Sequence, residues 1–371
     1  MKLADLPTPC LVLDRRALNR NLDLMDRVVG RHGVALRPHL KTAKSIDVAR
    51  MALSRPSARR GGGIAVATLA EAEYFVGHGI TDILLAAAIT PQKLEQVVKL
   101  NTAGASVAVG TDNAEVAELV GALPAPPRTL IEIDCGQHRS GLAPDDPALP
   151  ELARRLGPAF AGVLSHAGHS YGGRSGSDMR SYAEAERGAA VAAAELLAAA
   201  GFASHIVSIG STPTALHAGS MHGITEVRAG VYMFGDLFQS EIGSHPPGDI
   251  AVTVLASVIG AKPAEPSLVV DAGALALSMD RSTASTPRDY GYGLMLDLAG
   301  RRSFGRAIVQ RVWQEHGKVE LDPAHSAALP VGSKVRIAPN HACHTAAAHD
   351  RYFVVDEGDT VVAIWPRING W

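Results

Sequence analysis

The feature that most constrains this fold is a regular alternation, through the first two thirds of the chain, of short β-rich runs with longer helical patterns. The first run is LVLD at residues 11–14 and the last is EVRAGVY at 226–232. The runs between them are VALRPH, IAVAT, DILLAA, ASVAVG, TLIEIDCG, FAGVLSHAG and HIVSIGST. Strands that alternate with helices predict a parallel sheet. About eight such strands favour a closed (β/α)₈ barrel over an open sheet.

The pattern changes from about Asp249 onward. Closely spaced strands joined by turns follow, beginning with DIAVTVLASVIG and ending with TVVAIWP, and helical segments become few. This arrangement predicts an antiparallel β domain. We therefore expect a barrel over residues 1–245, although its first residues could join the β domain, and a β domain over 246–371. The turn-rich segment GSHPPG at 243–248 is the expected linker.

Composition excludes several classes of protein. The 371 residues, 47% of them hydrophobic, are enough to bury one large core or two unequal ones. The net charge is −2 and the basic residues are scattered, so a nucleic-acid partner is not expected. Three widely spaced cysteines indicate no disulfide framework and fit a reducing, cytoplasmic setting. We expect no membrane span and no signal peptide, because no apolar run approaches the roughly 18 residues that a span needs.

Polar residues follow several of the predicted barrel strands directly, where a barrel gathers its functional groups. Lys41 comes after the run VALRPH, and at a strand end it could be desolvated and flanked by cations, which makes a lysine a Schiff-base nucleophile. On composition alone, a solvated surface lysine is the commoner explanation. The turns at Ser211-Thr212 and at Gly230 offer backbone N–H groups and hydroxyls to an anion such as phosphate, although each alone is an ordinary turn.

A second group of candidate residues lies in PNHACH at 339–344, after the strand-like KVRIA. His341 and Cys343 project from the same side of an extended segment, and imidazole with thiolate suits Zn²⁺. Two protein ligands are few, so water or substrate would complete the coordination shell. A structural cysteine beside a hydrogen-bonded histidine is the alternative explanation.

Two further segments are candidates for a place at the barrel mouth. One is DYGYG at 289–293, which contains Tyr290 and Tyr292, and the other is QEHG at 314–317, which contains His316. His316 fits a β-turn equally well.

Taken together, these segments resemble the D-serine dehydratase and D-threonine aldolase group of fold-type III pyridoxal-phosphate (PLP) enzymes, which share the barrel of alanine racemase. The resemblance covers nearly the whole chain in family order. Its most specific motifs are RPHLKT and the late PNHAC, because other alanine racemase-like enzymes lack this metal pair. The other matching segments are TPCLVLD, ATLAEAE, IEIDCGQHRSG, LSHAGHSY, SIGSTPT, TEVRAGVYMFGD, DYGYG and QEHG.

The resemblance implies a role for each candidate residue. Lys41 would carry PLP through a Schiff base, and His341 with Cys343 would bind the metal. Arg139 would approach the phenolic oxygen of the cofactor, His166 would lie against its ring, Arg228 near the ring nitrogen, and Tyr171 at the cofactor wall. The residues expected to hold the phosphate are Ser211, Thr212, Gly230 and Val231.

The implied activity is a PLP- and zinc-dependent dehydration, with Mn²⁺ or Mg²⁺ as alternative metals. The substrate would be a small D-β-hydroxy amino acid, such as D-threo-3-hydroxyaspartate or D-serine, and the products a 2-oxo acid and ammonia. D-Threonine aldolases tend to carry an aspartate as the second metal ligand, so Cys343 favours the dehydratases. A head-to-tail homodimer is expected, since the β domain of this fold type covers the barrel mouth of a second subunit.

Three alternatives remain open at this stage. A metal-dependent retro-aldol cleavage to glycine and an aldehyde would need the same residues. A racemase would need a second base, for which Tyr290 or Tyr292 could serve, but the metal pair would then be unexplained. A non-catalytic PLP-binding protein would explain neither the C-terminal domain nor PNHAC.

Overall fold

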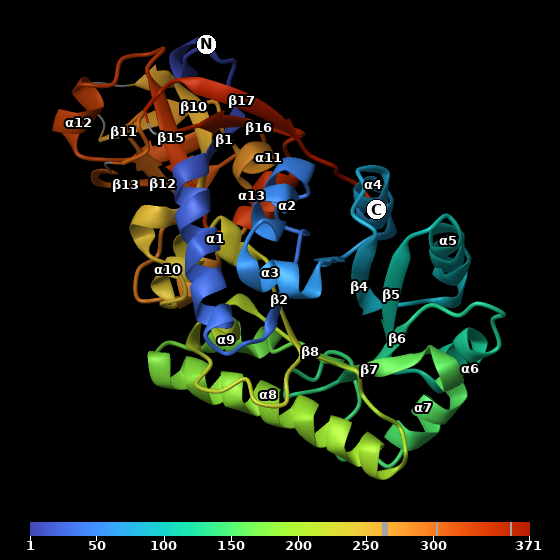
Figure 1. The fold of residues 1–371 in the computed structure, drawn as a ribbon. Coiled ribbons are helices and arrows are strands. Elements are labelled where there is room, and N and C mark those ends of the chain that lie inside the picture. The colour runs from blue at the N-terminus through green and yellow to red at the C-terminus, as the bar shows by residue number, and fades with distance from the viewer. Residues whose placement is uncertain (262–265, 302, 357) are drawn as a thin grey trace. The chain divides into compact units, whose positions relative to one another are not determined.

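The computed structural model describes residues 1–261, 266–301, 303–356 and 358–371, and these residues form two compact units (Figure 1). The barrel unit comprises Asp23–Gly230 and Ile368–Trp371, and the β unit comprises Met1–Leu22 and Val231–Arg367. Each unit has its own sheet. We describe the two units separately.

The described part of the barrel unit holds an eight-stranded parallel sheet in the order β2-β9-β8-β7-β6-β5-β4-β3. The segment after β2 closes it, because the His39 N–H donates to the Ala229 carbonyl and the Leu40 N–H donates to the Ala65 carbonyl, both at 2.8 Å. The predicted (β/α)₈ barrel is therefore confirmed. The strands are β2 (Ala35–Pro38), β3 (Ile64–Val66), β4 (Asp82–Ala88), β5 (Ser106–Thr111), β6 (Thr129–Ile133), β7 (Phe160–Ser165), β8 (Ile206–Ile209) and β9 (Glu226–Ala229).

Helices follow most of these strands, and side-chain caps fix where several of them begin. Thr68, Asn113 and Ser211 each accept a hydrogen bond from a backbone N–H of the first turn, which satisfies a group that the helix itself leaves free. The helices are α2 (Ile46–Leu53), α3 (Pro56–Gly61), α4 (Leu69–Gly77), α5 (Pro91–Thr102), α6 (Ala114–Gly121), α7 (Leu149–Leu156), α8 (Gly176–Ala199) and α9 (Thr212–His217).

The barrel interior differs from one side to the other. Its apolar side is a cluster of buried residues from β3 to β7, namely Ala65, Leu84, Ala108, Leu130 and Leu164. Strands β2, β8 and β9 also bury polar side chains, which include Arg37, Ser208, Glu226 and Arg228. Buried charges need partners, so this side of the barrel is where a polar site can be built.

The β unit is built on a nine-stranded sheet, counted over its described residues, in the order β11-β14-β13-β12-β15-β10-β1-β16-β17. Strand β1 lies between β10, to which it is antiparallel, and β16, to which it is parallel. The run at 11–14 therefore belongs to this sheet. The strands are β1 (Cys10–Asp14), β10 (Val252–Ala261), β11 (Ser267–Val270), β12 (Leu294–Leu296), β13 (Ser303–Val312), β14 (Gly317–Glu320), β15 (Lys334–Ala338), β16 (Arg351–Val355) and β17 (Val361–Pro366).

Helix α1 (Arg15–Gly30) follows β1 at once, because Asp14 Oδ1 accepts the backbone N–H groups of Arg16 and Ala17, both at 2.9 Å. Its buried residues recur at helical spacing and form one apolar stripe. They are Leu18, Leu22, Met25 and Val29. The short helices of the β unit are α10 (Leu237–Glu241), α11 (Ala274–Leu277), α12 (Pro323–Ala327) and α13 (Ala342–Ala347).

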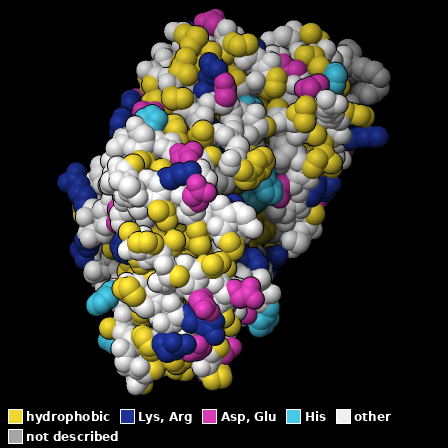
Figure 2. All heavy atoms as spheres, turned by 90° about the vertical axis from the view of Figure 1, so that its right-hand side faces the viewer, with side chains coloured by type: hydrophobic (Ala, Val, Ile, Leu, Met, Phe, Trp, Pro, Cys, Tyr) yellow, Lys and Arg dark blue, Asp and Glu magenta, His cyan; other side chains and the backbone are white. Residues whose placement is uncertain are grey.

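The surface carries charges of both signs. On the face that Figure 2 shows, Lys and Arg side chains are interspersed with Asp and Glu. Among the residues described, none of the helices combines the length and the hydropathy that crossing a bilayer requires.

Candidate functional site

Lys41 lies in the turn directly after β2, where the barrel closes, and it is exposed. Its backbone nitrogen is 3.5 Å from Nδ1 of His39. The residues on either side of it, Leu40 and Thr42, are buried. The position of Lys41 is therefore fixed by the barrel, while its amine is accessible.

His166 follows β7, and its ring is neutral at neutral pH. Nδ1 lies 2.7 Å from the Gly210 carbonyl, so Nδ1 donates its proton there and Nε2 keeps a lone pair. Burial lowers the pKa of His166, and the positive charges of Lys41, Arg228 and Arg139 add to this effect while the bond to Gly210 opposes it, so that the pKa is about 3. The structure thus brings three cationic candidates close to one histidine.

The pKa of His39 is lowered for the same reasons as that of His166. Burial lowers the pKa of this imidazole well below its usual value, and Lys41, Arg228 and His166 add to the effect. Two neutral histidines among cations give the barrel mouth a positive potential. That potential favours an anionic ligand such as a phosphate ester.

Arg228 is buried on β9, and neutral oxygens hold its guanidinium. It donates to the Ser208 hydroxyl and, at 2.7 Å, to the Ser165 carbonyl. Ser208 in turn donates to Glu226 at 2.7 Å, and the other carboxylate oxygen of Glu226 accepts from Arg37 Nε at 2.8 Å. Burial lowers the pKa of Arg228, while Glu226, Glu186 and Glu132 oppose that effect.

Two turns of the barrel unit have the backbone of an anion site. Gly210 has φ of +152°, and a Cβ there would lie 1.9 Å from the Arg228 carbonyl. A Cβ at Gly230 would lie 2.7 Å from the His39 carbonyl, so both positions need glycine. Ser211, the N-cap of α9, places its hydroxyl 3.0 Å from that of Ser170. Thr212 is buried beside it, and Val231 follows Gly230 in sequence.

Glu186 is a site residue that the sequence analysis missed. From α8 its carboxylate accepts the N–H of Ala167 at 2.8 Å, the N–H of Gly210 at 3.0 Å and the hydroxyl of Thr214 at 2.6 Å. Burial raises its pKa, and these hydrogen bonds oppose the rise. The available sequence signal was an acidic residue on the buried stripe of α8, whose other members are Met179, Ala183, Ala190, Ala193 and Leu197.

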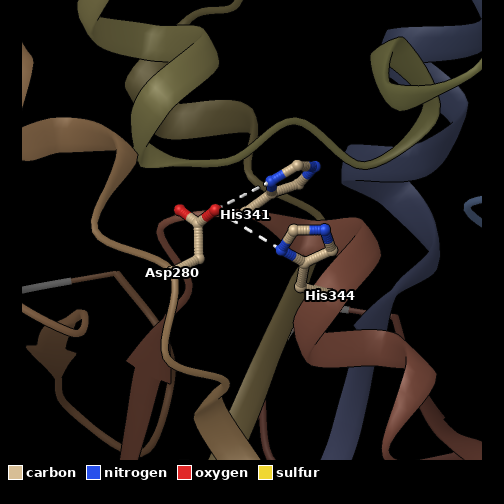
Figure 3. A group of neighbouring side chains, drawn as sticks. All are labelled: Asp280, His341 and His344. Carbon is tan, nitrogen blue, oxygen red and sulfur yellow. Dashed lines mark hydrogen bonds and ion pairs between the residues drawn. The ribbon is translucent and has the colours of Figure 1, made fainter.

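In the β unit, the structure brings three possible metal ligands together (Figure 3). Nδ1 of His341 lies 3.2 Å from Oδ2 of Asp280, and Nδ1 of His344 lies 3.4 Å from the same oxygen. The two imidazole rings stack with centroids 4.1 Å apart. Asp280 and His344 were not among the predicted ligands. Asp280 is 61 positions away in sequence from His341, so no local pattern could have indicated it.

The electrostatics of this group favour a cation. Although burial lowers it, the pKa of His341 is raised to about 11 by its hydrogen bonds to Asp280 and Cys343 and by the nearby charge of Asp236. Burial raises the pKa of Asp280, but His341 and Ser282 hold it well below its usual range. Cys343 is thus in contact with His341. The group can therefore provide nitrogen, sulfur and carboxylate donors to a metal ion.

The remaining candidates have structural partners of their own. The Tyr290 hydroxyl donates to Glu241 and accepts from Arg288, both at 3.0 Å. The Arg281 guanidinium lies 5.2 Å from the ring centroid of Tyr292. His316 is exposed in the turn between β13 and β14, and Tyr171 lies in the 3-10 helix Gly168–Gly172 after β7. The roles predicted for these residues remain predictions.

Two family models match this chain. The alanine racemase N-terminal domain matches residues 13–237, and the putative serine dehydratase domain matches residues 251–355. The chain is 41% identical to the D-threo-3-hydroxyaspartate dehydratase of Delftia sp. strain HT23, over 100% of this chain and 99% of the relative. It is 31% identical to the D-serine dehydratase of Dictyostelium discoideum, over 99% and 98% of the two chains. It is also 31% identical to a D-threonine aldolase of Arthrobacter sp., over 98% and 92%.

The fold agrees with solved structures of one of these relatives. The Delftia D-threo-3-hydroxyaspartate dehydratase superimposes with a TM-score of 0.93 at 40% identity, covering 100% of both chains. Two further structures of D-threo-3-hydroxyaspartate dehydratase are a cysteine-to-alanine variant in a metal-free form and a histidine-to-alanine variant. Each superimposes with a TM-score of 0.94. The two substituted residues lie two positions apart in that enzyme.

Proposed function

We propose that this chain, which belongs to the alanine racemase-like family of PLP-dependent lyases that includes the D-serine dehydratases, is a metal-dependent dehydratase of small D-β-hydroxy amino acids. Its substrate would be D-threo-3-hydroxyaspartate or D-serine. The reaction removes the β-hydroxyl as water, and subsequent hydrolysis gives a 2-oxo acid and ammonia. D-Serine would thus yield pyruvate, and 3-hydroxyaspartate would yield oxaloacetate.

One observation carries the proposal. His341 and Cys343 have the spacing of the histidine and cysteine that were substituted in D-threo-3-hydroxyaspartate dehydratase, where the cysteine variant is metal-free. In this chain the same two side chains are in contact, and a carboxylate adjoins them. Thiolate with imidazole favours Zn²⁺, with Mn²⁺ or Mg²⁺ as the alternative metals.

The barrel unit suits PLP. The glycine turns at Gly210 and Gly230 leave no room for a Cβ, and such turns let a phosphate approach backbone N–H groups. We assign the phosphate to these turns, with Ser211, Thr212 and Val231. Lys41 would hold the cofactor covalently, and the other contacts would come from Arg139, His166, Arg228 and Tyr171.

PLP, when bound, would supply an electron sink for the substrate Cα, and a metal held by His341 and Cys343 would supply a Lewis acid for the β-hydroxyl. Side chains of the barrel unit would provide proton transfer and positioning. Lys41, once free of the cofactor, takes the proton from Cα as a general base. His166 stays neutral and donates from Nδ1 to Gly210, so its ring orientation is fixed. Arg228 would keep a cation near the cofactor's ring nitrogen, in which case the cofactor would be a weaker electron sink and the metal would be more important.

Retro-aldol cleavage is the second candidate, because relatives named D-threonine aldolase and 3-hydroxy-D-aspartate aldolase match nearly the whole chain. It would use the same lysine and metal but release glycine and an aldehyde. The pair His341 and Cys343 favours dehydration, since the relative whose variants share its spacing is a dehydratase.

The deciding experiment is a product assay on four substrates: D-serine, D-threonine, and the threo and erythro forms of D-3-hydroxyaspartate. Ammonia and 2-oxo acid should form in equal amounts, with no glycine. Glycine and aldehyde as the main products would establish the aldolase instead. No product from any of the four would leave only a PLP-binding role.

We also propose that the protein acts as a head-to-tail homodimer in the cytoplasm. Among the described residues, Cys10, Cys135 and Cys343 are not joined in disulfide bonds, which is compatible with a reducing compartment. Light scattering coupled to size-exclusion chromatography should give twice the 38.7 kDa mass of the chain. A monomeric mass in the presence of cofactor would contradict the dimer.

A further inference from the structure

We infer that Asp280 is the positioning residue of the metal site: its carboxylate accepts a hydrogen bond from Nδ1–H of His341 and thereby presents the other ring nitrogen, Nε2, to the metal. This inference rests on the proposed function, which assigns the metal to His341 and Cys343. It adds Asp280, a residue that lies outside the sequence motif PNHAC.

The geometry of the Asp280–His341 contact carries the inference. Oδ2 of Asp280 lies 3.2 Å from Nδ1 of His341, and the Asp280 side chain is only 13% exposed. Figure 3 shows Nδ1 directed at the carboxylate and the second ring nitrogen directed away from it. In neutral histidine one nitrogen carries a proton and the other a lone pair. A carboxylate at Nδ1 keeps the proton there, so Nε2 is the nitrogen left for a metal.

The Asp280 carboxylate is itself held in place. Its other oxygen, Oδ1, accepts the backbone N–H of Ser282 at 2.9 Å and the Ser282 hydroxyl at 2.5 Å. Its main-chain carbonyl accepts from Nδ2 of Asn340 at 3.1 Å. Asn340 immediately precedes His341, so the segment that bears the carboxylate is tied to the segment that bears the imidazole. Only Oδ2 remains directed at the histidines.

The contact of Cys343 with His341 supports the same assignment, in which these two residues bind the metal and Asp280 positions His341. Its side chain is hydrogen-bonded to His341, so thiol and imidazole are already neighbours. A metal between them would replace that hydrogen bond. Asp280 would then act through His341, in the carboxylate–histidine–metal arrangement that orients many metal-bound imidazoles.

His344 belongs to this arrangement as a packing partner. Its Nδ1 lies 3.4 Å from the same Oδ2, and its ring stacks on that of His341 with an angle of 29° between the planes. The stacked ring restricts rotation of His341. The His344 side chain is 59% exposed, so its substitution should cost the protein little stability. The variant therefore tests whether His344 binds the metal directly.

The test measures Zn²⁺ affinity of the PLP-loaded, metal-stripped protein by competition with a chromophoric chelator. Asp280→Ala should weaken binding by about 10- to 100-fold, the range usual for a second-sphere carboxylate. Asp280→Glu should recover part of the loss. His341→Ala should reduce binding much further. Asp289→Asn is the matched control, because Asp289 lies in the same loop but pairs with Arg281, and it should bind Zn²⁺ as the wild type does.

A spectroscopic measurement separates positioning from direct ligation. With Co²⁺ at saturation, Asp280→Ala should keep the thiolate-to-cobalt charge-transfer band of the wild type, since Cys343 remains a ligand. His344→Ala should keep both that band and the Zn²⁺ affinity. Retention of wild-type affinity by Asp280→Ala would overturn the inference, and so would a loss as complete as that of His341→Ala, which would make Asp280 a direct ligand. If the wild-type protein binds no Zn²⁺ or Co²⁺, the metal in the proposed function fails and the inference fails with it.

Discussion

Two histidines, one in each unit, have pKa values shifted in opposite directions. His166 in the barrel unit has its pKa lowered to about 3, whereas His341 in the β unit has its pKa raised to about 11. Burial lowers the pKa of both. The difference comes from their neighbours, because cations from Lys41, Arg228 and Arg139 surround the first, while Asp280, Cys343 and Asp236 adjoin the second.

This contrast indicates which ligand each unit suits. The barrel mouth, where the histidines stay neutral among cations, favours an anion. The site around His341 and Asp280, where acidic groups hold an extra proton on the imidazole, favours a metal ion. Substitutions in the barrel unit should therefore impair PLP binding, and substitutions in the β unit should impair metal binding. The predictions below test that separation.

The largest expected effect is that of Lys41→Ala. The variant should lose the visible absorption of the lysine-linked cofactor, at about 410–430 nm, and with it the borohydride-sensitive linkage. Loss of the general base alone should lower kcat by about 10²- to 10⁴-fold. Zn²⁺ binding should be unaffected, since His341 and Cys343 are unchanged. A variant that keeps the band would show that another residue carries the cofactor.

Metal removal should lower turnover while the cofactor stays attached to the protein. Treatment with EDTA should lower turnover by at least about 100-fold, because a Lewis acid contributes several kcal/mol to a leaving hydroxide, while the visible cofactor band persists. Zn²⁺ should restore activity better than Mg²⁺. Full activity in exhaustively metal-free enzyme would disprove the mechanism.

Cys343→Asp tests whether the second metal ligand selects the metal and the reaction. An aspartate should weaken Zn²⁺ binding and raise the preference for the harder Mn²⁺ and Mg²⁺ ions. The products should also shift from 2-oxo acid and ammonia toward glycine and aldehyde. Cys343→Ser, which lacks both thiolate and carboxylate, is the control. Equal product ratios in all three proteins would mean that this ligand does not select the reaction.

Glu186→Ala should destabilise the barrel unit. It leaves two buried N–H groups, of Ala167 and Gly210, and the Thr214 hydroxyl without their acceptor, at about 1–3 kcal/mol each. PLP should also bind more weakly, because Gly210 and Ser211 lie in the turn assigned to its phosphate. Urea unfolding and cofactor titration measure the two effects. Glu184→Ala, on the exposed side of the same helix, should change neither.

The smallest effect is the pH dependence of stability due to His166. Its folded pKa of about 3 is below the unfolded value of 6.5, so between these values the unfolded state binds more protons. The contribution of His166 to stability is complete above about pH 6.5 and falls with decreasing pH, by at most about 1.4 kcal/mol per pH unit. His166→Asn should show a shallower loss in urea unfolding between pH 6 and pH 4, a range of about two units. An identical slope would indicate that the ring titrates normally.

The sequence by itself determined the barrel, and it predicted a change to closely spaced strands near residue 249 and the candidate residues Lys41, His341 and Cys343. These features are local. Alternation of strands and helices, a lysine directly after a strand, and a pair two residues apart can all be read within a few positions.

Only the tertiary structure decided three other features. It placed the first strand in the nine-stranded sheet of the β unit, beside β10 and β16. It brought Asp280 to His341 across 61 positions, and Glu186 to Thr214 across 28. It also shifted the pKa values of His166 and His341 in opposite directions. The physical reason is that strand pairing, hydrogen bonds and pKa shifts depend on which groups approach in space, and the chain order of those groups does not contain that information.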